Sequence, residues 1–116
     1  KINITEIDLN QLKNKYSFHD GLLENIVITT EAIILKFELL NMQTKDLQFI
    51  QLKFKQYTNL VFEEPMDINQ ENVSAGILNY EFINSSVSFF LEITNYETDE
   101  VAYSNLKFDY KTVTLE

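Results

Sequence analysis

The chain of 116 residues contains no cysteine and no tryptophan, and all nine of its basic residues are lysine. Without cysteine the chain can form no disulfide, use no thiolate as a nucleophile and hold no zinc through thiolates. Without arginine it cannot clamp a phosphate or carboxylate with the paired N–H groups of a guanidinium. The missing disulfides favour a reducing compartment, so we expect a cytoplasmic protein. Because the chain begins with Lys1 rather than methionine, a trimmed N-terminus and export stay open.

Long apolar runs are also missing. The longest, AIILKFELL at residues 32–40, is interrupted by Lys36 and Glu38, and a membrane-spanning helix needs about 20 apolar residues. No secretory signal is visible. Hydrophobic residues make up 45% of the chain and charged residues 23%, which is usual for a globular protein. This length suits a single domain over residues 1–116.

Positive charge is scarce. Nine lysines against eighteen acidic residues give a net charge of −9. Nucleic acids and anionic membranes are bound by neutralising phosphates with Lys and Arg, so neither is an expected partner. The charge fits a basic protein partner, or it serves solubility alone.

Glycine and proline are rare, since Gly21, Gly76 and Pro65 are the only ones. Turns must therefore fall mostly to Asn, Asp, Ser and Thr. The segments between turns are short, β-branched or aromatic, and alternate between apolar and polar residues, as half-buried strands do. These segments span residues 22–29, 32–40, 47–57, 59–65, 77–83, 86–94 and 105–116. Short connections indicate antiparallel pairing, and about seven strands predict an all-β sandwich or open barrel.

Residues 7–16 carry a helical pattern. Asp8 can cap a short helix in which Leu9, Leu12 and Tyr16 share one face. A strand over residues 2–7 can precede this helix.

Two of the predicted strands have apolar residues on both faces. Leu47 and Phe49 have the opposite parity to the apolar residues that follow, so we expect a β-bulge near Phe49 and Ile50. A second bulge around residues 111–112 would reconcile the two parities of the segment 105–116. Phe90 stands on the polar side of its strand, where a second layer or a partner can cover it.

The segment YSFHDGLLENIVIT contains the single histidine, His19, followed by Asp20 and Gly21. A catalytic histidine needs a carboxylate at one ring nitrogen and a substrate at the other. Neighbouring residues of an extended chain point to opposite sides, so Asp20 is poorly placed to orient His19. A structural role is the better interpretation: a tight turn in which Gly21 supplies a positive φ and His19 bonds to a neighbouring strand. A hydrolase or ligand site using His19 and Asp20 is the alternative.

No metal or cofactor site is expected. DINQENVSAGIL resembles a calcium-binding loop at Asp67, Asn69 and Glu71. It has Asn72 where such a loop needs glycine, and Leu78 where it needs a bidentate glutamate. One histidine without cysteine is too little for a transition metal.

Exposed carboxylates are predicted in two loops. They are Glu63, Glu64, Glu97, Asp99 and Glu100. Paired carboxylates can hydrolyse glycosides, and tyrosines can stack on sugars, so a carbohydrate-binding sandwich is one alternative. Acidic loops of this kind also form the rim of an interface with a basic protein.

FHDGLLENIVIT followed by AIILKFEL resembles an aromatic-His-Asp-small signature before a β-hairpin in small uncharacterised bacterial β proteins. Some of these are related to immunity proteins of polymorphic toxin systems. The matching residues are Phe18, His19, Asp20 and Gly21 and the hairpin 22–40, and the ending LKFDYKTVTLE is similar to the closing strand of such proteins. The resemblance implies an all-β fold, no known activity, and immunity as a function.

The sequence therefore predicts a non-enzymatic binding domain for a basic protein partner. The candidate binding residues are His19, Asp20, Glu63, Glu64, Glu97, Asp99 and Glu100. No catalytic residue is assigned, and the oligomeric state is left open.

Overall fold

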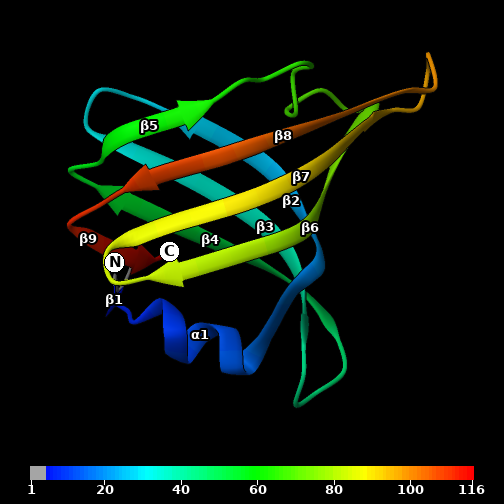
Figure 1. Ribbon diagram of the computed structural model, residues 1–116. Helices are drawn as coiled ribbons and strands as arrows, with labels where there is room; N and C mark the ends of the chain where they lie inside the picture. Colours follow the sequence, from blue (N-terminus) through cyan, green and yellow to red (C-terminus); the bar gives the residue numbers. More distant parts are fainter. Residues whose placement is uncertain (1–4) are drawn as a thin grey trace.

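A computed structural model describes residues 5–116, which form one antiparallel sheet of nine strands and one short helix (Figure 1). The elements in chain order are β1 (Thr5–Glu6), α1 (Leu9–Lys15), β2 (Tyr16–Ile28), β3 (Ala32–Asn41), β4 (Leu47–Lys55), β5 (Thr58–Phe62), β6 (Val73–Ile83), β7 (Ser86–Asn95), β8 (Glu100–Asp109) and β9 (Thr112–Leu115). The spatial order is β1-β9-β4-β3-β2-β6-β7-β8-β5. Because this order begins at β1 and ends at β5, the barrel is open, and the predicted all-β fold is confirmed.

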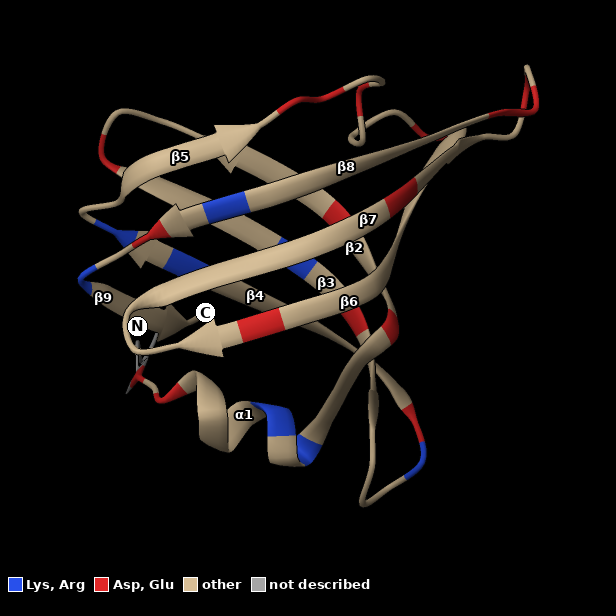
Figure 2. Ribbon diagram, in the orientation of Figure 1, with Lys and Arg blue, Asp and Glu red and all other residues tan. Residues whose placement is uncertain are grey.

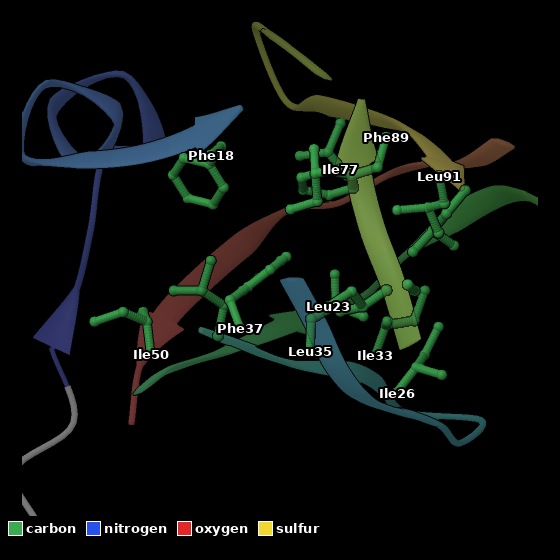
Figure 3. Packing of buried hydrophobic residues seen from close by; sticks show 14 of the residues in the cluster. Phe18, Leu23, Ile26, Ile33, Leu35, Phe37, Ile50, Ile77, Phe89 and Leu91 are labelled. Carbon is green, nitrogen blue, oxygen red and sulfur yellow. The ribbon is translucent and has the colours of Figure 1, made fainter. Parts of the chain in front are cut away.

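The sheet curves so strongly that its two halves face each other. In Figure 1, β6, β7, β8 and β5 form the half in front, and β2, β3, β4 and β9 form the half behind. Aromatic rings meet between the halves: the ring centroids of Phe37 and Phe89 are 5.5 Å apart, and those of Phe54 and Phe108 are 5.0 Å apart. Figure 3 shows Phe37 and Phe89 among the core side chains gathered between the halves. One continuous core therefore holds the halves together, because this is where the apolar surface leaves water.

The helix forms where the sequence predicts it. The Asp8 carboxylate accepts a hydrogen bond from Asn10 N at 2.9 Å, as an N-cap does. The helix lies below the two halves in Figure 1, and its Leu9 is buried as part of the hydrophobic core. The predicted strand before the helix is present as β1, and the part of that prediction at residues 2–4 lies outside the described residues. No helix within residues 5–116 is long and apolar enough to cross a membrane.

The segment 105–116 is two strands rather than one bulged strand. β8 pairs with β7 and β5 in the front half, whereas β9 pairs with β4 in the half behind. The change of parity arises because Tyr110 and Lys111 carry the chain from one half of the sheet to the other. This break and the separate β1 account for nine strands where about seven are predicted.

The predicted bulge near Phe49 and Ile50 is wrong. Pairing between β3 and β4 runs without interruption from Ala32–Lys55 to Leu40–Leu47. In an uninterrupted strand Leu47 and Phe49 share the outer face, and their residues are 65% and 61% exposed. The apolar residues of β4 therefore lie on both faces of the sheet: Ile50, Leu52 and Phe54 face the core, whereas Leu47 and Phe49 face outward.

Turns fall to small polar residues, as predicted. Among the described residues, positive φ angles occur at Asp20, Lys45, Gln56, Asn59, Asn84 and Asp99. Asn and Asp tolerate this left-handed backbone better than most residues. Four of these six positions are Asn or Asp, which take the place of glycine at left-handed positions in this chain.

Candidate functional site

Charge is divided between the two halves of the sheet. Residues 56–106 contain nine acidic residues and no lysine, whereas the rest of the chain holds nine lysines and nine acidic residues. Residues 56–106 form β5, β6, β7 and most of β8, the front half. The whole net charge of −9 therefore belongs to one half of the molecule.

Most of this negative charge gathers at one end of the front half, at the upper right in Figure 2. We call this surface the acidic end, and its exposed members are Glu63, Glu64, Asp67, Glu71, Glu97, Asp99 and Glu100. The structure thus places the five carboxylates predicted in two separate loops at the same end of the sheet.

Hydrogen bonds tie these two loops to each other. The Ser104 hydroxyl of β8 donates to the backbone oxygen of Glu63. Asn72 bonds to the Asn95 side chain at 2.9 Å, and its backbone oxygen accepts from Tyr96 N at 2.9 Å. Ser104 lies four residues after Glu100, the first residue of β8, which is about 13 Å along the strand from the β7–β8 turn. The acidic end is therefore a broad surface on anchored backbone.

Apolar and aromatic side chains stand beside the acidic end. We call them the aromatic stripe, and its members are Phe90, Tyr96, Val101 and Tyr103. The Phe90 and Tyr103 rings stack at 6.0 Å with an interplanar angle of 18°. Tyr96 is 68% exposed and Tyr103 is 58% exposed. Each ring can therefore bury a large apolar area when a partner protein covers it. Phe90 is on the outer face, as its parity predicts.

Tyr103 is held by a carboxylate. Its hydroxyl donates to Glu92 Oε2 at 3.1 Å. This hydrogen bond and the negative charge of Glu92 raise the pKa of Tyr103 above its usual value. The phenol stays protonated and stays a hydrogen-bond donor over the physiological range.

A shallow hollow lies on the same outer face, at the opposite end of β7. It measures about 470 Å³, and Glu81, Ile83, Ser86, Ser88, Lys107 and Asp109 contribute to its lining. Asn59 Nδ2 donates to Asp109 Oδ2 at 2.7 Å. This hydrogen bond, with a second from Ser86, lowers the pKa of Asp109. The hollow therefore presents hydroxyls, an amine and two carboxylates, of which Asp109 is held by hydrogen bonds, to a small polar ligand.

His19 and Asp20 lie on a bulge of β2 in the other half of the sheet. Pairing with β3 stops at Ser17–Leu40 and resumes at Leu22–Glu38, so four residues of β2 face Leu39 alone. His19 Nε2 lies 3.6 Å from Asp20 Oδ2, and the two side chains are 65% and 79% exposed. The expected bond from His19 to a neighbouring strand is not formed within residues 5–116, and neither residue lines the hollow.

The neighbours of this pair are structural. Phe18 is fully buried, and its ring lies 5.5 Å from Phe37 and 5.1 Å from Phe82. The positive φ belongs to Asp20 rather than to Gly21. Gly21 is needed for space, because a Cβ atom there would lie 2.5 Å from Leu39 Cδ2. The motif therefore turns one face to the core and exposes two polar side chains.

Sequence reasoning found the carboxylates, offered Tyr96 and Tyr103 as aromatic platforms for a sugar and placed Phe90 on the polar face of its strand, but it missed Val101 and did not join these residues into one stripe. The sequence does indicate that Val101 and Tyr103 are exposed, because they share the parity of the polar residues Asn105 and Lys107 in the same strand. The division of charge is also readable as a run of 51 residues without lysine. Among residues 5–116, no group of three or more His, Asp and Glu side chains is arranged to hold a metal ion.

Comparisons of the chain with protein-family models, curated proteins and solved structures gave no match.

Proposed function

We propose that this chain is a non-enzymatic interaction domain that binds a basic protein through the acidic end and the aromatic stripe. The observation that carries the proposal is the confinement of the whole −9 charge to the half of the sheet with the exposed Tyr96 and Tyr103. Interfaces are enriched in tyrosine, and charged rims steer association. The stripe would supply buried contact area and the carboxylates would supply rate and specificity.

A nucleic-acid-cutting toxin is the partner class that we favour. Such an enzyme needs a basic surface for the phosphate backbone, and an acidic domain can occupy that surface in place of the phosphates. The resemblance to immunity proteins, which rests on Phe18, His19, Asp20 and Gly21, implies a toxin as the partner but not which kind of toxin. In this proposal the domain neutralises the toxin by covering its substrate site.

The test pairs two triple variants of equal net charge. In the first, carboxylates of the acidic end are neutralised: Glu97→Gln, Asp99→Asn and Glu100→Gln. In the control, exposed carboxylates outside residues 56–106 are neutralised: Glu6→Gln, Glu31→Gln and Glu116→Gln. Asparagine at position 99 keeps the left-handed backbone (φ 60°).

Each variant is co-expressed in turn with the basic proteins encoded by neighbouring genes, and binding is measured at several salt concentrations. We expect the first variant to associate more slowly and to lose protection, while the control behaves as the unmodified chain. Equal losses in both variants would mean that only total charge matters. Absence of binding and protection by the unmodified chain would overturn the proposal.

A second candidate function is binding of a carbohydrate or another small polar ligand in the hollow beside β7. The hollow combines serine hydroxyls with Lys107 and Asp109, and Phe90 stands next to it across Ser88. Sugars are bound by such polar groups beside an aromatic ring. A glycan array on which the chain gives no signal would contradict this function.

A further inference from the structure

We infer that Glu92, Tyr103 and Phe90, on the outer face of β7 and β8, bind one arginine side chain of the basic partner, which makes this inference rest on the proposed function. The three residues are neighbours by strand register. Glu92 and Tyr103 are direct cross-strand partners, and Phe90 precedes Glu92 by two residues on the same face of β7. A carboxylate and two aromatic rings therefore meet on one small part of the sheet.

The Glu92 carboxylate keeps most of its capacity to accept hydrogen bonds. Its Oε2 accepts from the Tyr103 hydroxyl at 3.1 Å, and no other side chain within residues 5–116 bonds to it. An ionised carboxylate has about four lone-pair sites. On the β6 side the cross-strand partner of Glu92 is Gly76, and a Cβ atom built there would lie no closer than 3.9 Å to any atom. There is therefore room for a ligand beside Glu92.

No cation of this chain neutralises Glu92. Among residues 5–116 the only oppositely charged side chains within 4 Å of each other are those of His19 and Asp20. Residues 56–106 contain no lysine, and Lys107 lies four residues beyond Tyr103, or about 13 Å along β8. A carboxylate covered by a partner needs an opposite charge beside it. At Glu92 this charge has to come from the partner.

The other half of the sheet contains a similar arrangement that has its own cation. Glu38 of β3 and Phe49 of β4 are direct cross-strand partners. Lys36, two residues before Glu38 on the same face, places its Nζ 4.8 Å from the centre of the Phe49 ring. Phe90 occupies the corresponding position of β7. The front half therefore has the carboxylate and the ring of this arrangement, and a second ring where the other half has its lysine.

Arginine fits this site better than lysine does. The Phe90 and Tyr103 rings are nearly parallel, with an interplanar angle of 18°, and both residues are exposed. A guanidinium is planar, so it can stack on a ring while its paired N–H groups bond to a carboxylate, whereas an ammonium acts as a point charge. The chain itself contains no arginine, so neither its own side chains nor a second copy can supply this group.

The test is an NMR titration of the full chain with blocked amino acids, in which the ring signals of Tyr103 are followed. The probes are the Nα-acetyl methylamides of arginine, of lysine and of citrulline, which has the shape of arginine without its charge. The test variant Glu92→Gln turns the carboxylate into an amide of the same shape. The matched control Glu38→Gln makes the same change beside the Phe49 ring. A further variant, Phe90→Leu, removes one ring and keeps an apolar side chain.

We expect the arginine probe to shift the Tyr103 signals, the lysine probe to bind more weakly, and the citrulline probe not to bind. Glu92→Gln should weaken arginine binding by roughly tenfold and Phe90→Leu by roughly threefold, while Glu38→Gln leaves it unchanged. Equal binding of the arginine and citrulline probes, stronger binding of lysine, equal effects of Glu92→Gln and Glu38→Gln, or no effect of Phe90→Leu would each overturn the inference.

This titration and the co-expression test of the proposed function can fail independently. If the arginine probe does not bind, Glu92 is not part of an arginine site, and the two triple variants still show whether the acidic end binds a basic protein. If the probe binds as expected but the unmodified chain binds none of the basic proteins, the proposed function fails and the arginine site stands.

Discussion

The Asp20 carboxylate turns back on His19, so that Asp20 Oδ2 lies 3.6 Å from His19 Nε2 although the two residues are adjacent in one strand. The cause is the left-handed backbone of Asp20, whose φ is 65°. The extended geometry assumed from the sequence does not hold at this residue, but the 3.6 Å separation is longer than a hydrogen bond, so Asp20 does not fix the orientation of the His19 ring. Because both side chains are mostly in water, the pair is screened and contributes little to stability.

Substitution of His19 tests whether the pair has a structural role. His19→Ala removes a side chain that is 65% exposed and, within residues 5–116, makes no hydrogen bond, so we expect the free energy of unfolding to change by less than about 0.5 kcal/mol. Urea unfolding measures this change. A loss above about 1 kcal/mol would show that His19 supports the fold. If His19→Ala keeps the stability of the fold but no longer shows the rise in melting temperature that a ligand causes, His19 has a binding role instead.

The two glycines give a matched pair of substitutions. In Gly21→Ala the new Cβ atom would lie 2.5 Å from Leu39 Cδ2 and 3.1 Å from the backbone oxygen of Phe18. Since Leu39 is fully buried, it cannot move away freely, and we expect destabilisation by about 1–3 kcal/mol. In Gly76→Ala the nearest atom lies at 3.9 Å, so this control should change stability little. Equal effects of the two substitutions would refute the packing explanation.

Much of the fold follows from local pattern. The hairpin of β2 and β3 and the inward side of β7 are predicted correctly, because alternation and buried area act together there. Phe89 and Leu91 are buried as the pattern requires. The prediction fails in the segment 47–57, where the apolar residues of both parities were assumed to lie in the core, and this assumption required a bulge at Phe49 that the pairing does not contain.

The candidate site was predictable as a set of residues but not as a surface. Glu63 and Glu100 are far apart in the sequence, and their common place depends on β5 pairing with β8. Such non-local pairing is set by the curvature of the whole sheet, which no short pattern encodes. The absence of lysine from residues 56–106, by contrast, can be read from the sequence. Only the fold shows that these residues form one half of the molecule.

The hydrogen bond between Tyr103 and Glu92 makes a titration prediction. Glu92→Gln keeps an acceptor but removes the negative charge beside the phenol, so the pKa of Tyr103 should fall toward its usual value. NMR of the tyrosine ring carbon during an alkaline titration measures this pKa. Glu81→Gln, a change of the same kind on the same outer face, should leave Tyr103 unaffected. An unchanged pKa in Glu92→Gln would refute the contact.

Asn59 and Asp109 provide a second titration prediction. Asn59→Gly removes the amide that donates to Asp109 but allows the same left-handed backbone (φ 56°). The pKa of Asp109 should therefore rise toward its ordinary value of 3.8. Asn84→Gly makes the same change at another left-handed position (φ 55°) and should leave Asp109 unaffected. NMR of the carboxyl carbons measures both pKa values.

The same substitution has a defined effect on stability against pH. Because the folded-state pKa of Asp109 is lowered, its interaction with Asn59 stabilises the fold above the unfolded-state pKa. This stabilisation is lost as the pH falls through the folded-state pKa. The difference in unfolding free energy between the unmodified chain and Asn59→Gly should therefore be largest at neutral pH and shrink in acid. If this difference in unfolding free energy stays constant as the pH falls through the folded-state pKa of Asp109, Asn59 acts on the backbone and not on the Asp109 carboxylate.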